Sequence, residues 1–255
     1  MSQQDTHTTI ACLGSSTTAA RGTFNWIAEL KKRPQNRTVK FLNFGVGGDL
    51  SYNALQKIHK VIEAAPDKVL ILIGSNDILA MVFPSVKRIY MRWKRLPQEP
   101  SVTWFRENLQ QIIRQIKAQT SAEIAVASLA EVGEAPESKN IVQLQLNMLF
   151  GNFAEIIKEV AEEEGVHYLP FYERFHGAIL VSPGRAFTRF SFLSFYRDYL
   201  FREFILRYSF DKIAQMNGWQ FHIDGVHLNT RGGMILVDLV QEFLTHTTYD
   251  RFISC

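Results

Sequence analysis

Asp224 and His227 stand three residues apart near the C-terminus, and their types suit the acid and base of a nucleophilic triad. Near the other end of the chain, the apolar run 9–13 leads through a glycine into Ser15 and Ser16. A serine hydroxyl is a weak nucleophile unless an imidazole accepts its proton and a carboxylate orients that imidazole. This geometry arises with unrelated chain orders, so the order found here is compatible with it. The three residue types therefore predict a serine nucleophile.

Two apolar runs between these ends finish in residues that can donate hydrogen bonds. Residues 42–49 end in glycines and an aspartate, and residues 70–77 end in Gly-Ser-Asn-Asp. A glycine such as Gly48 lets a backbone N–H approach a ligand closely, and Asn76 offers a side-chain amide. Acyl transfer needs such donors where the oxyanion develops, each worth about 3 kcal/mol of barrier. Gly47 could donate in place of Gly48, and Asn76 could instead cap a helix. All four blocks are predicted to lie at strand ends.

The four blocks together resemble those of the SGNH hydrolases, the GDSL esterase/lipase family, and the resemblance runs from residue 14 to residue 227. The site residues that it implies are Ser16 as nucleophile, Asp224 and His227 as acid and base, and Ser16, Gly48 and Asn76 as oxyanion donors. Ser16 is favoured over Ser15 because the family's nucleophile stands two residues after the turn glycine.

The chain departs from the family pattern at three positions. Ser15 stands where the family name has Asp, Thr17 where it has Leu, and Leu228 where proline is usual. The Ser15 change affects the support of the turn that carries the nucleophile and leaves the triad itself intact.

The resemblance implies a serine-dependent hydrolase of carboxylic esters that forms an acyl-enzyme on Ser16 and needs no cofactor. Its substrate is expected to be a small-molecule or lipid-like ester. An acyltransferase or a thioesterase on the same scaffold is the alternative. A second alternative is a module that binds lipid or a partner protein through its aromatic segment.

Alternating apolar runs and helix-like segments predict βαβ units and a parallel sheet. The predicted strands are 8–13, 38–44, 68–73, 122–128 and 166–170. The predicted helices are 23–33, 51–65, 101–119, 139–164 and 229–246, with Ser51 and Asn229 as N-caps and an amphipathic pattern that begins at Ser101. Together with the resemblance, this predicts an α/β fold of the flavodoxin-like type. It would be a three-layer α/β/α sandwich with a central, mostly parallel five-stranded sheet and helical insertions. Ligands bind beyond the carboxyl ends of such strands.

Composition limits the function further. The 255 residues suit one domain, 1–255, and a net charge of +3 gives no argument for nucleic-acid binding. Two cysteines suggest no disulfide framework, and no zinc-binding motif is present. His222 lies close to the Asp224–His227 pair but out of register with it, and is interpreted as a structural or lining residue. The N-terminus has neither the charge nor the apolar run of a signal peptide, so a cytoplasmic protein is expected.

Two insertions exceed what the predicted fold needs, near 79–100 and 176–217. The first holds the basic and aromatic run 87–95, interpreted as a solvated helix face rather than a binding patch. The second holds the aromatic segment 186–210, whose polar residues would share one helical stripe. This segment is expected to form core or an oligomer contact, or else a lid or a peripheral contact with lipid. The oligomeric state does not follow from the sequence.

Overall fold

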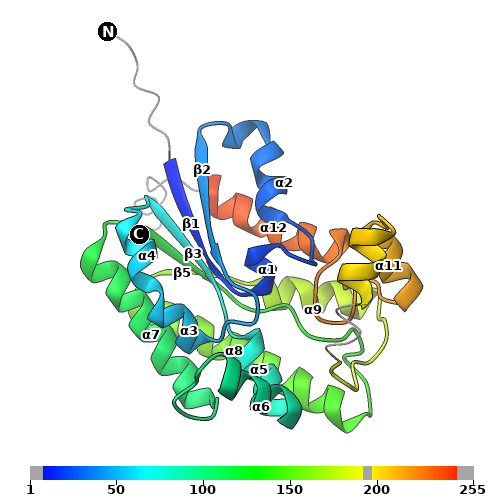
Figure 1. Cartoon of the computed structure of the whole chain (residues 1–255). Coiled ribbons are helices and arrows are strands. Elements are labelled where there is room, and N and C mark those ends of the chain that lie inside the picture. Colours follow the sequence, from blue (N-terminus) through cyan, green and yellow to red (C-terminus); the bar gives the residue numbers. More distant parts are fainter. Residues whose placement is uncertain (1–7, 192–196, 246–255) are drawn as a thin grey trace.

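Five parallel strands form one sheet in the computed structural model, which describes residues 8–191 and 197–245 (Figure 1). The strands are β1 (Thr8–Gly14), β2 (Val39–Gly45), β3 (Lys68–Leu72), β4 (Glu123–Ala127) and β5 (His167–Leu169). Their order is β2-β1-β3-β4-β5, and every neighbouring pair is parallel. This arrangement confirms the predicted sheet, with each strand within two residues of its expected bounds.

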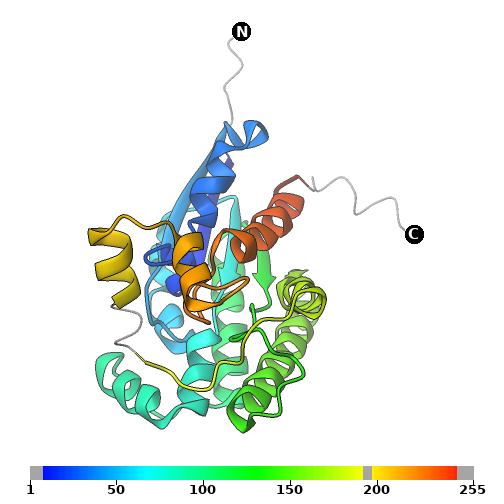
Figure 2. The same cartoon turned by 90° about the vertical axis from the view of Figure 1, so that its right-hand side faces the viewer.

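Helices cover both faces of the sheet. They are α1 (Ser16–Ala19), α2 (Trp26–Lys32), α3 (Ser51–Gln56), α4 (Ile58–Glu63), α5 (Ser75–Val82), α6 (Pro84–Trp93), α7 (Val102–Gln119), α8 (Ile141–Glu164), α9 (Phe171–Val181), α11 (Phe210–Asn217) and α12 (Thr230–Thr245), with a short 3-10 turn η1 (Pro34–Asn36) and a π-helix η2 (Arg197–Ile205). Helices α2 and α12 pack together on one face, and α3, α4, α7 and α8 pack on the other (Figures 1 and 2). This is the predicted α/β/α sandwich. Among the described residues, none of the helices combines the length and the apolar character that crossing a membrane requires.

The central strands β1, β3 and β4 are buried on both sides because they are nearly continuous apolar runs, whereas the edge strands β2 and β5 are only partly buried. Val69, Leu70 and Ile71 of β3 and the four residues 124–127 of β4 are almost fully buried. The strand order reverses between β1 and β3, because β2 lies on the outer side of β1 and β4 lies on the outer side of β3. In open α/β sheets the ligand site lies at such a point, beyond the carboxyl ends of the strands.

A side chain can cap a helix only when it is not hydrogen-bonded elsewhere, and this decides which of the predicted helix starts are correct. Helix α7 follows Ser101, where its pattern was predicted to begin, and the Ser101 side chain caps it. The predicted cap Asn229 accepts a hydrogen bond from the Gly232 N–H at the start of α12. The predicted cap at Ser51 is wrong, since this residue lies inside α3 and its hydroxyl donates to Asp77. The predicted helix 51–65 is also wrong, because the chain breaks at Lys57 into α3 and α4.

Part of the aromatic segment, 192–196, and the last residue of the predicted helix 229–246 lie outside the described residues. Residues 197–205 form the π-helix η2 at the periphery of the ribbon, in yellow in Figure 2. Its Asp198 is buried, whereas Leu200, Phe201, Phe204 and Ile205 are between 49% and 66% exposed. The expectation that this apolar face forms core is therefore wrong for η2.

Candidate active site

Ser16 is the first residue of α1, and Ser15 alone separates it from the end of β1 at Gly14. The short helix lies so close to the end of β2 that a Cβ on Gly45 would stand 2.2 Å from the Ala19 nitrogen. Glycine at this position therefore lets the turn carrying the serine sit against the sheet. Ser15, the other candidate, is buried as the N-terminal flanking residue of α1.

The glycine turn after β2 is held from two sides. Gly48 has φ +74°, a conformation that favours glycine. The next residue, Asp49, is buried and forms ion pairs with Lys57 at 2.5 Å and Lys94 at 2.8 Å. Lys94 also donates to the carbonyl of Gly47 at 2.7 Å. One lysine near the end of the 79–100 insertion thus fixes both ends of the turn that presents Gly48.

Asn76 lies in the first turn of α5, after β3. Its Nδ2 donates to the Asp49 carbonyl at 2.9 Å, and its Oδ1 accepts from the Tyr90 hydroxyl at 2.9 Å. The Tyr90 bond fixes which side of the amide carries the donors, because a hydroxyl held here donates to the oxygen. The neighbouring Asp77 is fully buried, accepts from Ser51, and has its pKa raised to about 7 by burial. Asp77 is thus a structural carboxylate.

Replacing Tyr90 by phenylalanine is expected to lower about fivefold the kcat of the ester hydrolysis that the family resemblance implies, with KM little changed. One neutral hydrogen bond contributes about 1 kcal/mol, and here it orients an amide rather than touching substrate. Steady-state kinetics beside Tyr52→Phe, a tyrosine stacked on Trp104 with no role in the site, provides the control. In an Asn76→Ala background the Tyr90 change should have no further effect. An undiminished loss of activity in that background would contradict a role exerted through Asn76.

Asp224 and His227 lie in the loop between α11 and α12, which an isolated antiparallel bridge between His222 and Leu228 closes. The prediction that all four blocks lie at strand ends is therefore wrong for this one. His227 Nδ1 lies 2.8 Å from Asp224 Oδ2, and the backbone N–H groups of Val226 and His227 donate to Asp224 Oδ1. The tight turn passes through Gly225 at φ +93°.

Electrostatics couple the two residues of this loop. Burial raises the pKa of Asp224, but the charge and hydrogen bonds of His227 outweigh it and lower the pKa from 3.8 to about 2. Burial lowers the pKa of His227, but the Asp224 charge and hydrogen bond raise it above its ordinary 6.5. The pair therefore favours a carboxylate beside an imidazolium, the state that follows when a histidine accepts a proton.

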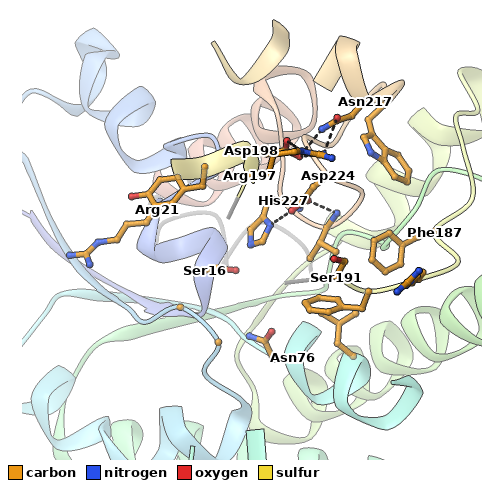
Figure 3. A pocket seen from close by; sticks show the side chains of 18 of the residues that line it. Ser16, Arg21, Asn76, Phe187, Ser191, Arg197, Asp198, Asn217, Asp224 and His227 are labelled. Atoms are coloured by element: carbon orange, nitrogen blue, oxygen red, sulfur yellow. Dashed lines mark hydrogen bonds and ion pairs between the residues drawn. The ribbon is translucent and has the colours of Figure 1, made fainter. Parts of the chain in front are cut away.

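One cavity of about 1000 Å³ is lined by all five predicted site residues, namely Ser16, Gly48, Asn76, Asp224 and His227. Figure 3 shows the imidazole of His227 between Asp224 and Ser16, with Asn76 on the far side of the serine. Ser15 is absent from the lining residues of this cavity. The arrangement brings a hydroxyl, an imidazole–carboxylate pair and amide donors to one space, which is the equipment for acyl transfer.

Several lining residues were not found from the sequence. Tyr90 and Lys94 belong to the run 87–95 that was interpreted as a solvated face. Arg185 directly precedes the aromatic segment and Arg189 lies within it. The amphipathic pattern of residues 87–95 indicates a helix with one buried face. Only the fold shows that this helix packs against Asn76 and Asp49. His222 is buried between Glu134 and the Glu131 carbonyl, as a structural residue. Within the described ranges, no cluster of three His, Cys, Asp or Glu residues could hold a metal ion.

Comparison with known proteins gives a family and several structural neighbours. The model of the GDSL-like lipase/acylhydrolase family matches residues 12–233. Axe2, an acetylxylan esterase from Geobacillus stearothermophilus, is 14% identical with a TM-score of 0.62, over 94% of this chain and 95% of that one. The acetyl xylan esterase AlAXEase is 17% identical with a TM-score of 0.61, over 92% and 99%. No match was found among curated proteins.

Proposed function

Because this chain belongs to the GDSL-like lipase/acylhydrolase family and is a carboxylic ester hydrolase, we propose that it works through an acyl-enzyme on Ser16. The observation that carries this proposal is the shared cavity, which collects Ser16, the Asp224–His227 pair and Asn76 from three separate parts of the chain. The single domain predicted for residues 1–255 is part of the same proposal.

In the proposed reaction, His227 accepts the Ser16 proton as Oγ attacks the acyl carbon. Asp224 holds the imidazole by its Nδ1–H and stabilises the imidazolium that forms. The N–H groups of Ser16 and Gly48 and the amide of Asn76 bind the oxyanion of the tetrahedral intermediate. His227 then protonates the leaving alcohol, and a water molecule, deprotonated by the same imidazole, releases the acid from the acyl-enzyme. The reaction needs no cofactor.

The substrate is proposed to be a small-molecule ester. The cavity of about 1000 Å³ is larger than an acetyl group alone requires, and Phe187, Phe190 and Trp219 line part of it. The acetylxylan esterases share the fold at 14–17% identity, which carries no substrate to this chain. A thioesterase would use the same groups with a sulfur leaving group, and an acyltransferase would replace water by another acceptor.

A fluorophosphonate probe tests the nucleophile directly, because it reacts with an activated serine whatever the natural substrate. We expect the wild-type protein to be labelled at Ser16 and the Ser16→Ala variant to remain unlabelled, while Ser15→Ala is labelled like wild type. Mass spectrometry of the labelled peptide identifies the residue. Hydrolysis of p-nitrophenyl esters from acetyl to palmitoyl then gives the chain-length preference. Labelling of the Ser16→Ala protein would refute the assignment.

A second candidate function is docking on a lipid surface through η2. The observation that favours it is the exposed apolar face of this helix, with Phe201 at 52% and Phe204 at 66% exposure. Such faces mark interaction sites, and amphipathic helices with basic residues bind at lipid interfaces. The contact would bring a lipid-like ester close to the cavity, since Arg197 and Tyr199 of the same helix line it.

The double variant Phe201→Ser/Phe204→Ser is expected to lower binding to anionic phospholipid vesicles at least about tenfold, because each aromatic ring removed from lipid costs about 1.5–3 kcal/mol. Co-sedimentation measures it. The matched control is Ile141→Ser/Met148→Ser, two similarly exposed apolar residues of α8. Equal vesicle binding by the wild type and both variants would contradict docking through η2, and only the hydrolysis of a soluble ester would remain.

A further inference from the structure

The cavity in front of Ser16 carries more positive charge than its own carboxylates balance. Six basic side chains line it, namely Arg21, Lys94, Arg185, Arg189, Arg197 and Arg202. The acidic side chains among the described lining residues are Asp198 and Asp224. Both are engaged, since Asp224 pairs with His227 and Asp198 accepts from two arginines and an asparagine.

Three of the six cations already have carboxylate partners. Arg197 and Arg202 bind Asp198 at 2.8 and 2.9 Å, and Lys94 binds Asp49 at 2.8 Å. These ion pairs build the wall of the cavity and leave little charge for a ligand.

The other three, Arg21, Arg185 and Arg189, make no ion pair with any carboxylate of the part of the chain described here. All three are exposed. Arg185 is nevertheless held in place, because its guanidinium lies 5.1 Å from the centre of the Trp219 ring and donates to the Asn217 carbonyl. A fixed cation without a counter-charge is ready to bind an anion.

These three arginines flank the reacting serine from two directions. Arg21 follows the short helix that begins at Ser16, and the other two stand on either side of Phe187 in the segment after α9. Figure 3 shows Arg21 and Phe187 on opposite sides of Ser16. A cleft lined by charge of one sign concentrates ligands of the opposite sign, and a guanidinium matches the geometry of carboxylates and phosphates.

We propose that the ester cleaved at Ser16 carries an anionic group, a carboxylate or a phosphate, which Arg21, Arg185 and Arg189 bind. This inference rests on the proposed function, because it assigns the substrate class of the same cavity. The anionic group belongs either to the acyl part or to the alcohol part of the ester. Two pairs of substrates, each an anionic ester and its neutral counterpart, distinguish the two positions.

The first pair is p-nitrophenyl valerate and mono-p-nitrophenyl glutarate, which differ by a carboxylate at the end of the acyl chain. The second pair is phenyl butyrate and m-carboxyphenyl butyrate, which differ by a carboxylate on the alcohol. In one pair at least, we expect the wild-type kcat/KM to favour the anionic ester about tenfold. Raising NaCl from about 50 mM to about 500 mM should reduce this preference, because salt screens exposed charges.

Arg21→Gln, Arg185→Gln and Arg189→Gln are each expected to lower the ratio of anionic to neutral kcat/KM about three- to tenfold, the size of an exposed charged contact. Arg88→Gln is the matched control, since Arg88 is equally exposed on α6 and does not line the cavity. This control should leave the ratio unchanged.

Binding to the Ser16→Ala protein gives a second measurement that does not depend on turnover. Titration with the same esters should give tighter binding of the anionic member, and the arginine changes introduced into this variant should remove the difference. Equal binding of both members, or a preference that survives all three arginine changes, would overturn the inference. Failure of the proposed function is separate, since it would show as undiminished hydrolysis of both esters by the Ser16→Ala protein.

Discussion

The Ser16→Ala variant should lose ester hydrolysis by at least about 10⁴-fold in kcat while keeping its fold. In the proposed mechanism the Ser16 hydroxyl oxygen forms the acyl-enzyme, and without it the oxyanion donors alone would leave only a small residual rate. The side chain is small and at the cavity wall, so thermal unfolding should shift little. Steady-state kinetics with p-nitrophenyl esters and a melting curve measure the two effects.

Ser15→Ala is the control for this prediction. Ser15 is adjacent in sequence and equally small, but its side chain makes no capping hydrogen bond at the start of α1. Its removal should change kcat by less than about tenfold, or about 1.4 kcal/mol, because Ser15 does not line the cavity that Ser16 shares with Asp224 and His227. A larger loss in Ser15→Ala than in Ser16→Ala would exchange the two assignments.

Asp224→Asn is the second change with a large expected effect, a loss of about 10⁴-fold in kcat. The asparagine can still accept the backbone N–H groups of Val226 and His227 through its oxygen, which preserves the loop. It places an amide where the carboxylate oxygen accepts from His227 Nδ1, which favours the wrong tautomer of the imidazole. If Asp224→Glu has a higher kcat than Asp224→Asn, the negative charge at this position contributes to the rate.

The pH dependence of the wild type and of Asp224→Asn separates two effects of Asp224, the orientation of the imidazole and the negative charge beside it. His227 must be neutral to accept a proton, and the fraction of neutral imidazole rises with pH. Since Asp224 raises the pKa of His227 above 6.5, wild-type kcat/KM should fall as pH drops through a midpoint above that value. Without the carboxylate charge, burial alone remains and the midpoint should move to lower pH. An identical midpoint in both proteins would contradict the coupling of the pair.

The sheet could be predicted well from the sequence because the central strands β1, β3 and β4 are short apolar runs, and a glycine or a serine follows each within two residues. The predicted nucleophile, Gly48 and Asn76 follow three adjacent strands, so the topology alone brings them together. The position of Asp224 and His227 could not be predicted this way, because a loop between two helices carries them. Their local spacing, however, already predicted the contact between them.

The insertions were recognised as extra sequence, but their contacts depend on long-range packing that has no local pattern. Tyr90 meets Asn76 only because α6 folds back over the turn after β3. Asp198 belongs to the polar stripe predicted for the aromatic segment, yet it is buried, where two arginines and Asn217 compensate its charge. A helix can bury a charged residue when its ion-pair partners lie in the same helix. The apolar periodicity of the sequence then assigns the wrong face of the helix to the protein interior.

The two insertions also bear on how such an enzyme can diverge. Lys94 and Tyr90 of the first hold the Gly47 carbonyl and the Asn76 amide, beside the proposed oxyanion donors. Asn217 of the second donates to the Ile223 carbonyl, next to Asp224. The segments that shape the pocket wall are thus the same ones that hold the reacting groups in place. Selection for a new substrate acting on these segments would change the rate as well, and grafting them onto a relative with the same sheet would transfer specificity and reactivity as one unit.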